Sequence, residues 1–203
     1  MALTAPVSKT FDLTPAGNHV ARLYQIVHIG TVKDSYMGEE KETDKIRLAF
    51  ELSNERKVFN EGEEPRPFSI SREFTFSMGT KANLRKFVEG MHGVALHDEE
   101  AAGFDLEQLL GDACLLSVVH KESASGKTYA LIQGASPLPK GMDAPAQVNE
   151  GRLIDVNTAT QEEIEALPEF IRDKMKSSKE YDERFRSAET VNDHGIKDGD
   201  IPF

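Results

Sequence analysis

One stretch of eight residues decides the fold: Lys45-Ile46-Arg47-Leu48-Ala49-Phe50-Glu51-Leu52. Its even-numbered residues are all apolar, whereas its odd-numbered residues are charged or small. Because successive side chains point to opposite faces of a β-strand, this alternation predicts a strand with one buried face and one polar face. We expect Ile46, Leu48, Phe50 and Leu52 to point into a core, and the charged residues to point outward.

Two further strands are expected on either side of this stretch. Residues 18–34 are rich in Val, Ile, Leu and Tyr, and residues 68–78 carry mostly apolar side chains at even positions. Simple alternation along the first of these strands places Leu23 and Val27 on the same face. Gly30 lies late in that strand, where a bulge or a sharp bend is expected.

A helix and a hairpin complete the predicted body. Thr80 is a candidate cap for a helix whose apolar residues between 84 and 91 are spaced for one face. Residues 113–121 and 128–136 are expected to form two strands joined by a tight turn at Ser125-Gly126. Three strands, a helix and two strands are the order of the OB-fold, a five-stranded Greek-key barrel with its helix between strands three and four. The predicted fold class is therefore all-β.

The chain divides into four predicted segments. Residues 1–17 form an N-terminal arm, and residues 18–141 form the OB-fold domain. Residues 142–186 are a linker with weak helical segments that either dock on the body or stay frayed. Residues 187–203 are a disordered acidic tail, because they are polar and offer few side chains for a core.

Charge is spread unevenly along the 203 residues. The net charge is −11, of which residues 142–203 carry −7 and residues 1–141 carry −4. A mildly acidic body excludes a basic domain of the usual nucleic-acid-binding kind. Any DNA site must then be a local basic groove.

Composition also indicates the compartment. No apolar run is long enough to cross a membrane, so an integral membrane protein is not expected. Residues 1–11 lack the pattern of a secretory signal. Cys114 is the single cysteine and lies in an apolar stretch, which favours a buried structural thiol. We expect a cytoplasmic protein, in a bacterial cell or an infected host cell.

The OB-fold map brings basic and aromatic side chains to one groove. Single-strand binding needs cations for phosphates and rings on which bases stack. In this fold the groove crosses strands two and three, between the loop joining strands one and two and the loop joining strands four and five. The predicted single-stranded DNA-binding residues are Tyr24, Lys33, Tyr36, Lys45, Arg47, Arg72, Phe74, Lys121 and Lys127. Two alternatives stay open: outward cations on strands can be merely solvated, and Phe74 can belong to the core.

Enzymatic and metal-binding patterns are missing from the sequence. Gly126-Lys127-Thr128 lacks the earlier glycine of a phosphate-binding loop and lies on a predicted hairpin. The histidines and Cys114 have no zinc-ligand spacing, and no nucleophile-elbow motif occurs. We therefore predict no catalytic residue, no metal site and no cofactor.

The last residues of the sequence are the most distinctive motif: Asp198-Gly199-Asp200-Ile201-Pro202-Phe203. An apolar pocket rimmed by basic side chains could bury the Phe203 ring and pair with its carboxylate. This segment resembles the acidic Ile-Pro-Phe tip of bacterial single-stranded DNA-binding proteins, which recruits replication, recombination and repair enzymes. The resemblance implies a partner-binding site made of Asp198, Asp200, Ile201, Pro202 and Phe203.

The body resembles a different branch of the same class. Gly103-Phe104-Asp105 and Leu109-Leu110-Gly111 are similar to segments of single-stranded DNA-binding proteins encoded by phages or mobile elements. Together the resemblances imply a non-enzymatic protein that binds and protects single-stranded DNA and recruits host or viral enzymes. An adaptor or decoy that binds those enzymes without binding DNA, and a strand-annealing recombination protein, are the alternatives. Self-association of the chain is left open.

Overall fold

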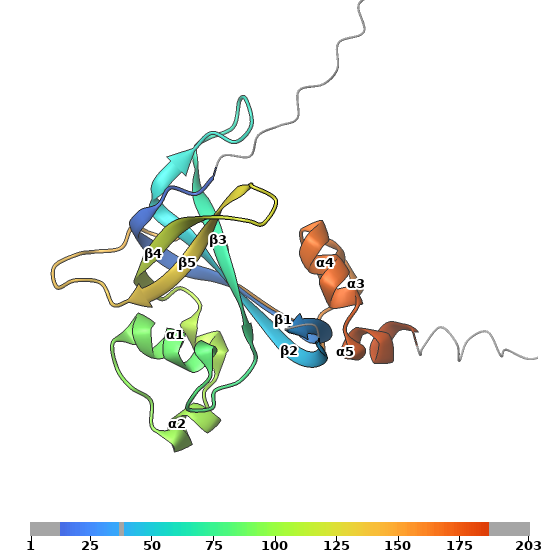
Figure 1. The fold of residues 1–203 in the computed structure, drawn as a ribbon. Helices are drawn as coiled ribbons and strands as arrows, with labels where there is room; N and C mark the ends of the chain where they lie inside the picture. Colours follow the sequence, from blue (N-terminus) through green and yellow to red (C-terminus); the bar gives the residue numbers. More distant parts are fainter. Residues whose placement is uncertain (1–12, 37–38, 187–203) are drawn as a thin grey trace, which may run out of the picture.

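The computed structural model describes residues 13–36 and 39–186. It is mostly β (Figure 1). An open antiparallel sheet has the order β3-β2-β1-β4-β5, and a short sixth strand runs parallel to β1. The strands are β1 (Gly17–Tyr36), β2 (Glu39–Lys57), β3 (Arg66–Thr75), β4 (Ala113–Glu122), β5 (Thr128–Ser136) and β6 (Arg152–Asp155). The predicted order of three strands, a helix and two strands is confirmed.

The helices lie on two sides of the sheet, with α1 and α2 on one side and α3 to α5 on the other (Figure 1). They are α1 (Asn83–His92), α2 (Asp98–Ala102), α3 (Gln161–Glu165), α4 (Glu169–Lys176) and α5 (Lys179–Tyr181), with a 3₁₀ turn η1 (Leu106–Leu109) and a π-helical turn η2 (Asp182–Arg186). The cap predicted at Thr80 is wrong, because α1 begins after Ala82, which makes no side-chain cap hydrogen bond. None of the helices in the described ranges is long and apolar enough to span a membrane.

β1 organises the sheet because it pairs with three other strands. The start of β1 pairs with β4, and its residues Gln25–His28 pair with β6. Most of the length of β1 also pairs with β2. The pairing with β2 slips at Tyr24 and again just before Gly30, where φ is +91°. The irregularity predicted at Gly30 is confirmed. A Cβ at this position would lie 2.5 Å from Oε2 of Glu180 in α5, so both the backbone angle and the close approach require glycine.

The first core lies between the sheet and α1. Ile46, Leu48, Phe50 and Leu52 are buried, as the alternation predicts. The Phe50 ring meets Phe87 of α1 edge to face, with ring centroids 5.9 Å apart.

Cys114 is also buried in this core, and burial, with a contribution from the charge of Asp112, raises the pKa of its thiol to about 12. The expected buried thiol is therefore found, and at neutral pH it is protonated and unreactive.

The second core lies on the opposite face of β1. Val27, Ile29 and Val32 point away from the first core and pack against β6 and the helices that follow it. The other members of this core are Ile154, Val156, Ala159, Ile164, Leu167, Ile171, Met175 and Tyr181, with Phe185 at the edge. We call residues 152–186, which supply these partners, the C-terminal layer.

The segment predicted as a linker with weak helical pieces therefore has two parts. Residues 142–151 run along the sheet without regular structure, where backbone amides of Val148 and Asn149 each donate to the buried Glu51 carboxylate over 2.8 Å. Arg22 donates to the Pro145 carbonyl over 2.7 Å. Residues 152–186 then add a strand and three helices that are packed on β1, which is the docked alternative of the prediction.

Candidate nucleic-acid interface

A charged cluster joins α4 to the outer face of β2 and β3. Arg47 of β2 and Glu73 of β3 are register partners, and Nη1 of Arg47 donates to Oε1 of Glu73 over 3.1 Å. Arg47 also donates to the hydroxyl of Ser71. From the other side, the Lys174 ammonium of α4 pairs with Oε2 of Glu73. Glu73 therefore holds two cations, one from the sheet and one from the C-terminal layer.

Phe170 lies beside this cluster. The guanidinium carbon of Arg47 is 4.8 Å from the centre of the Phe170 ring, which is within the range of a cation–π contact. The Phe170 side chain is nevertheless 59% exposed. A large aromatic ring on α4 thus faces solvent next to the cations of the sheet.

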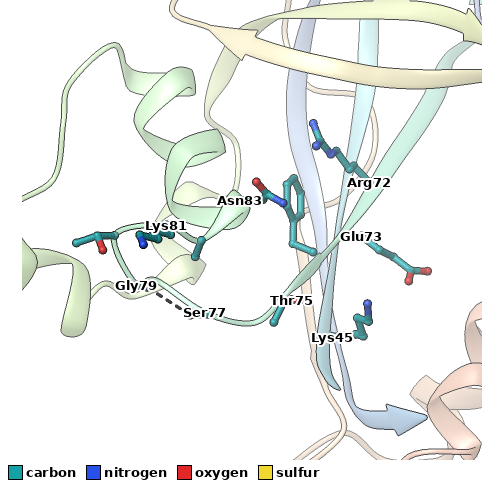
Figure 2. Close-up of a pocket in the computed structure, with 11 residues that line it drawn as sticks. Lys45, Arg72, Glu73, Thr75, Ser77, Gly79, Lys81 and Asn83 are labelled. Carbon is teal, nitrogen blue, oxygen red and sulfur yellow. Dashed lines mark hydrogen bonds between the residues drawn. The ribbon is translucent and has the colours of Figure 1, made fainter. Parts of the chain in front are cut away.

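A pocket of about 610 Å³ runs along the free edge of β3 (Figure 2). Arg72 and Glu73 are neighbours on this strand, and they point to opposite sides of it in Figure 2. Three cations line the pocket, namely Lys45, Arg72 and Lys81. Nζ of Lys45 lies 2.6 Å from Oδ2 of Asp34. Because Arg72 and Glu73 both line the pocket and point to opposite sides of β3, the pocket opens onto both faces of the strand.

Arg72 bridges the two outer strands of the sheet. Its Nη1 donates to the carbonyls of Ile132 and Gln133 in β5, each over 3.2 Å. Its guanidinium also lies over the ring of Phe74, 4.9 Å from the centroid. Burial lowers the pKa of Arg72, but a guanidinium stays charged at any physiological pH. This cation is held in place at the rim of the pocket before any ligand arrives.

The start of α1 contributes to the same pocket. Ala82 and Asn83 line it, and the first turn of the helix carries no acidic residue. The first backbone amides of a helix have no partner within the helix, and the helix dipole makes this end positive. The positive end of α1 therefore adds to the cations of the pocket.

We call this set of cations the basic strip: Lys45, Arg47, Arg72, Lys81 and Lys174. Its paired carboxylates are Asp34 and Glu73, so positive charge is in excess. This excess occurs in a chain of net charge −11. The strip is thus a local departure from the charge of the whole protein, and it suits a polyanion.

The structure brings together some of the predicted DNA-binding residues. Lys45 and Arg72 line one pocket, and Arg47 adjoins it through Glu73. Tyr24 is half-buried at the bulge of β1. Lys45, Arg47 and Arg72 therefore lie around one part of β2 and β3.

Other predicted residues lie elsewhere. Lys33 is exposed on the extended ribbon of β1 and β2, while Lys121 and Lys127 are exposed at the β4–β5 hairpin, all outside this pocket. Phe74 requires a correction: its side chain is 4% exposed and packs against Phe87, so it cannot offer a face to a base. The side chain of Tyr36 lies outside the described part of the chain, as do residues 198–203.

The sequence prediction missed three contributors to the interface. Lys81 precedes α1, and Phe170 and Lys174 come from α4. Ile171, the neighbour of Phe170 on α4, is buried, whereas Phe170 itself is exposed. The sequence feature that could have identified Phe170 and Lys174 is their spacing. They are four residues apart, and residues four apart lie on one face of a helix.

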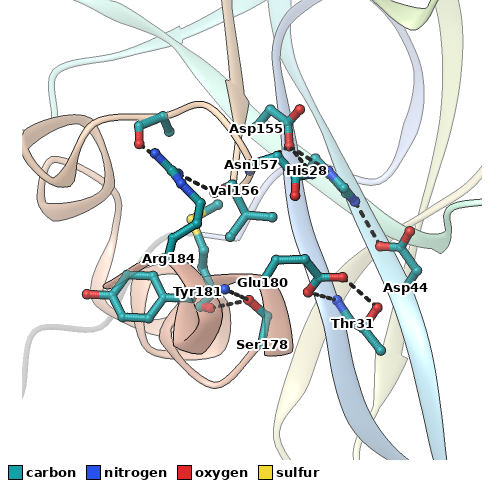
Figure 3. Close-up of polar contacts among 12 residues, drawn as sticks. His28, Thr31, Asp44, Asp155, Val156, Asn157, Ser178, Glu180, Tyr181 and Arg184 are labelled. Atoms are coloured by element: carbon teal, nitrogen blue, oxygen red, sulfur yellow. Dashed lines mark hydrogen bonds and ion pairs between the residues drawn. The ribbon is translucent and has the colours of Figure 1, made fainter. Parts of the chain in front are cut away.

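A network of ionised groups fixes the C-terminal layer against β1 and β2 (Figure 3). His28 of β1 lies between two carboxylates, with Nδ1 2.7 Å from Oδ1 of Asp155 and Nε2 2.8 Å from Oδ1 of Asp44. Each contact needs an N–H donor, so the ring that makes both is a doubly protonated imidazolium. Burial by itself would lower the pKa of His28, but the bonds and charges of Asp155 and Asp44 outweigh it, and the pKa is raised.

Two further sets of hydrogen bonds hold the end of the C-terminal layer, one to β1 and one within the layer. The backbone amide and the hydroxyl of Thr31 both donate to the Glu180 carboxylate of α5 over 2.7 Å. Arg184 donates to the carbonyls of Val156 and Ala159. The Thr31 bonds fix α5 on β1 (Figure 3), and the Arg184 bonds fix η2 to the segment between β6 and α3.

No group of three or more His, Cys, Asp or Glu side chains suited to a metal ion occurs among residues 13–36 and 39–186. Compared with known proteins, the chain matches no protein-family model and no curated protein.

Proposed function

We propose that the protein binds single-stranded DNA along the basic strip, protects it during replication, recombination or repair, and recruits enzymes of those processes. The observation that carries the proposal is the excess of cations along β3, next to an exposed aromatic ring, in an otherwise acidic chain. Cations neutralise phosphates and rings stack on bases, which are the two needs of single-strand binding.

The proposal includes an OB-fold for the body. Three observations support it: the strand order β3-β2-β1-β4-β5, the position of α1 between β3 and β4, and a long bent β1 that is shared by both halves of the sheet. Arg72 also joins β3 to β5, the two strands whose approach closes such a barrel. In this fold the outer face of β2 and β3 is the usual place for a nucleic-acid strand, and Arg47 lies there.

Recruitment is assigned to Asp198, Asp200, Ile201, Pro202 and Phe203. Its support is the resemblance of this segment to the tip of bacterial single-stranded DNA-binding proteins. Binding of tail peptides to repair or replication enzymes, with the native Phe203 and with Phe203→Ala, tests this half of the proposal. The peptide that lacks the ring should lose most of its affinity.

A titration of a labelled oligo-dT by fluorescence anisotropy, at several salt concentrations, tests DNA binding by the full chain. Removing two cations in Lys81→Ala/Lys174→Ala should weaken binding and reduce the slope of log affinity against log salt by about 1.4, since each lost phosphate contact removes about 0.7 on single strands. Arg56→Ala/Lys140→Ala removes the same charge from exposed positions outside the pocket and should change little. Equal slopes in the two double variants would refute the assignment to the strip.

A further inference from the structure

The Phe170 ring is exposed but contacts the guanidinium of Arg47 on one face. Single exposed apolar side chains are common on protein surfaces and need no explanation. This ring differs because the Arg47 guanidinium covers one of its faces at 4.8 Å. Arg47 is itself fixed by Glu73 and Ser71. The ring therefore has one face backed by a cation and a surface that is 59% open to solvent.

The helix beneath the ring is anchored firmly. Ile171 and Met175 of α4 are buried in the second core, so the helix cannot roll without exposing them. Lys174 follows Phe170 by four residues and lies on the same helical face, where it pairs with Glu73. Ring and ammonium are thus presented together toward the sheet at little further cost in conformational entropy.

We propose that Phe170 is a stacking platform for one unpaired base of the bound strand. The base lies on the open face of the ring, Arg47 backs the other face, and Lys174 and Lys45 neutralise flanking phosphates. The ligand class is single-stranded nucleic acid, because both faces of a base in a duplex are covered by its stacked neighbours. This inference rests on the proposed function and adds to it a binding residue from outside the predicted barrel.

The surroundings of the ring favour this ligand over an apolar protein surface. Charged side chains lie beside the ring, since Arg47 contacts Phe170 and its neighbour Lys174 pairs with Glu73. An apolar partner would take these charges out of water without new bonds, which is costly. A nucleotide provides both an aromatic face for the ring and an anion for the cations beside it.

A single tryptophan can report on the stacking directly, because the chain contains none. In Phe170→Trp, oligo-dT should quench the tryptophan fluorescence in step with binding measured by anisotropy. A duplex of the same length and inorganic polyphosphate should not quench it, even where the cations attract them. Phe59→Trp is the matched control, because Phe59 is 49% exposed in the β2–β3 loop and outside the pocket, and its signal should stay constant.

Affinity measurements separate stacking from other roles of the ring. Phe170→Ala should weaken oligo-dT binding by about 5-fold to 150-fold, since a base–aromatic stack contributes about 1–3 kcal/mol. Phe170→Leu keeps an apolar side chain without a π-face and should lose a similar amount. The salt slope should stay as in the native chain, because no phosphate contact is removed.

The outcomes distinguish this inference from the proposed function. If the native chain binds oligo-dT but Phe170→Trp is not quenched and Phe170→Ala binds equally well, the stacking platform is refuted and DNA binding stands. Equal quenching by duplex would also refute it, because the ring would then not be selecting unpaired bases. If the native chain fails to bind oligo-dT at low salt, the proposed function itself fails.

Discussion

The two cores of this protein back onto the same strand but are built differently. The first core is formed by long strands and α1, and its members are apolar side chains. The second core is formed by short elements that follow residue 151, and ionised groups close its boundary. His28 and Glu180 each take part in hydrogen bonds between β1 and the C-terminal layer, and Arg184 makes hydrogen bonds within the layer.

This difference divides the proposed interface into two parts. Lys45, Arg47 and Arg72 belong to strands that the first core fixes. Phe170 and Lys174 belong to a helix that depends on the second core. The interface should therefore be assembled from a rigid part and a part whose docking varies with solution conditions. Substitutions in each core test whether the two parts can be separated.

The largest effect is expected from Phe50→Ala in the first core. The side chain is fully buried beside Phe87, so its truncation should lower the free energy of unfolding by about 3–5 kcal/mol. That is a large share of the roughly 5–15 kcal/mol typical of a native protein. Urea unfolding followed by circular dichroism measures it. The C-terminal layer should be lost in the same transition, since it has no strand to dock on once β1 unfolds.

A smaller and more local effect is expected from Ile164→Ala in the second core. Ile164 is fully buried, and its truncation should cost the layer about 2–5 kcal/mol. Native-state hydrogen exchange should show faster exchange for residues 152–186 and unchanged protection in β2. Ile132→Ala makes the same change at a fully buried position of the first core and should accelerate exchange throughout the sheet. Identical exchange patterns in the two variants would mean that the cores do not act separately.

The first core could be predicted because its signal is local. The apolar residues from Ile46 to Leu52 alternate within one strand, and no distant information is needed to assign their face. The same reasoning failed in β1, where Leu23 and Val27 were expected on one face but lie in different cores. The slip at Tyr24 shifts the alternation by one residue, and that bulge depends on the pairing with β2.

The second core could not be predicted because its contacts join segments far apart in sequence. α3, α4 and α5 are each too short to be stable alone, and the apolar surface that stabilises them is the back of β1. In the interface, too, the residues with a local sequence pattern could be predicted, and those that depend on distant segments could not. Lys45 and Arg47 were predicted from strand alternation, whereas Phe170 lies 123 residues from Arg47 in the sequence and reaches it only through the docked layer.

The smallest effect on stability is expected from pH, which changes the hydrogen bonds of His28 to Asp155 and Asp44. Besides Asp155 and Asp44, this ring faces the amide of Asn157 and the charge of Glu180. Because the folded pKa of His28 is raised above the ordinary value of 6.5, its hydrogen bonds to Asp155 and Asp44 stabilise the layer fully below about pH 6.5. This contribution is lost as the pH rises through the folded pKa, when the ring gives up one N–H donor. The lost charge-assisted bond should cost about 1.5–3 kcal/mol.

Fluorescence of Phe170→Trp during urea unfolding at several pH values between 5 and 9 measures this loss within the layer. His28→Gln is the matched control, because a glutamine does not titrate and should flatten the dependence of stability on pH over this range.

The contact between His28 and Asp155 is also lost in acid. Burial alone would raise the pKa of Asp155, but bonds from Asn157 and His28 lower it below 3.8. The carboxylate therefore contributes above pH 3.8 and fails only as the pH falls through its lower folded value. If Phe170→Trp shows the same dependence between pH 5 and 9 with and without His28→Gln, His28 adds nothing to the docking of the layer, and the contrast between the two cores loses this electrostatic support.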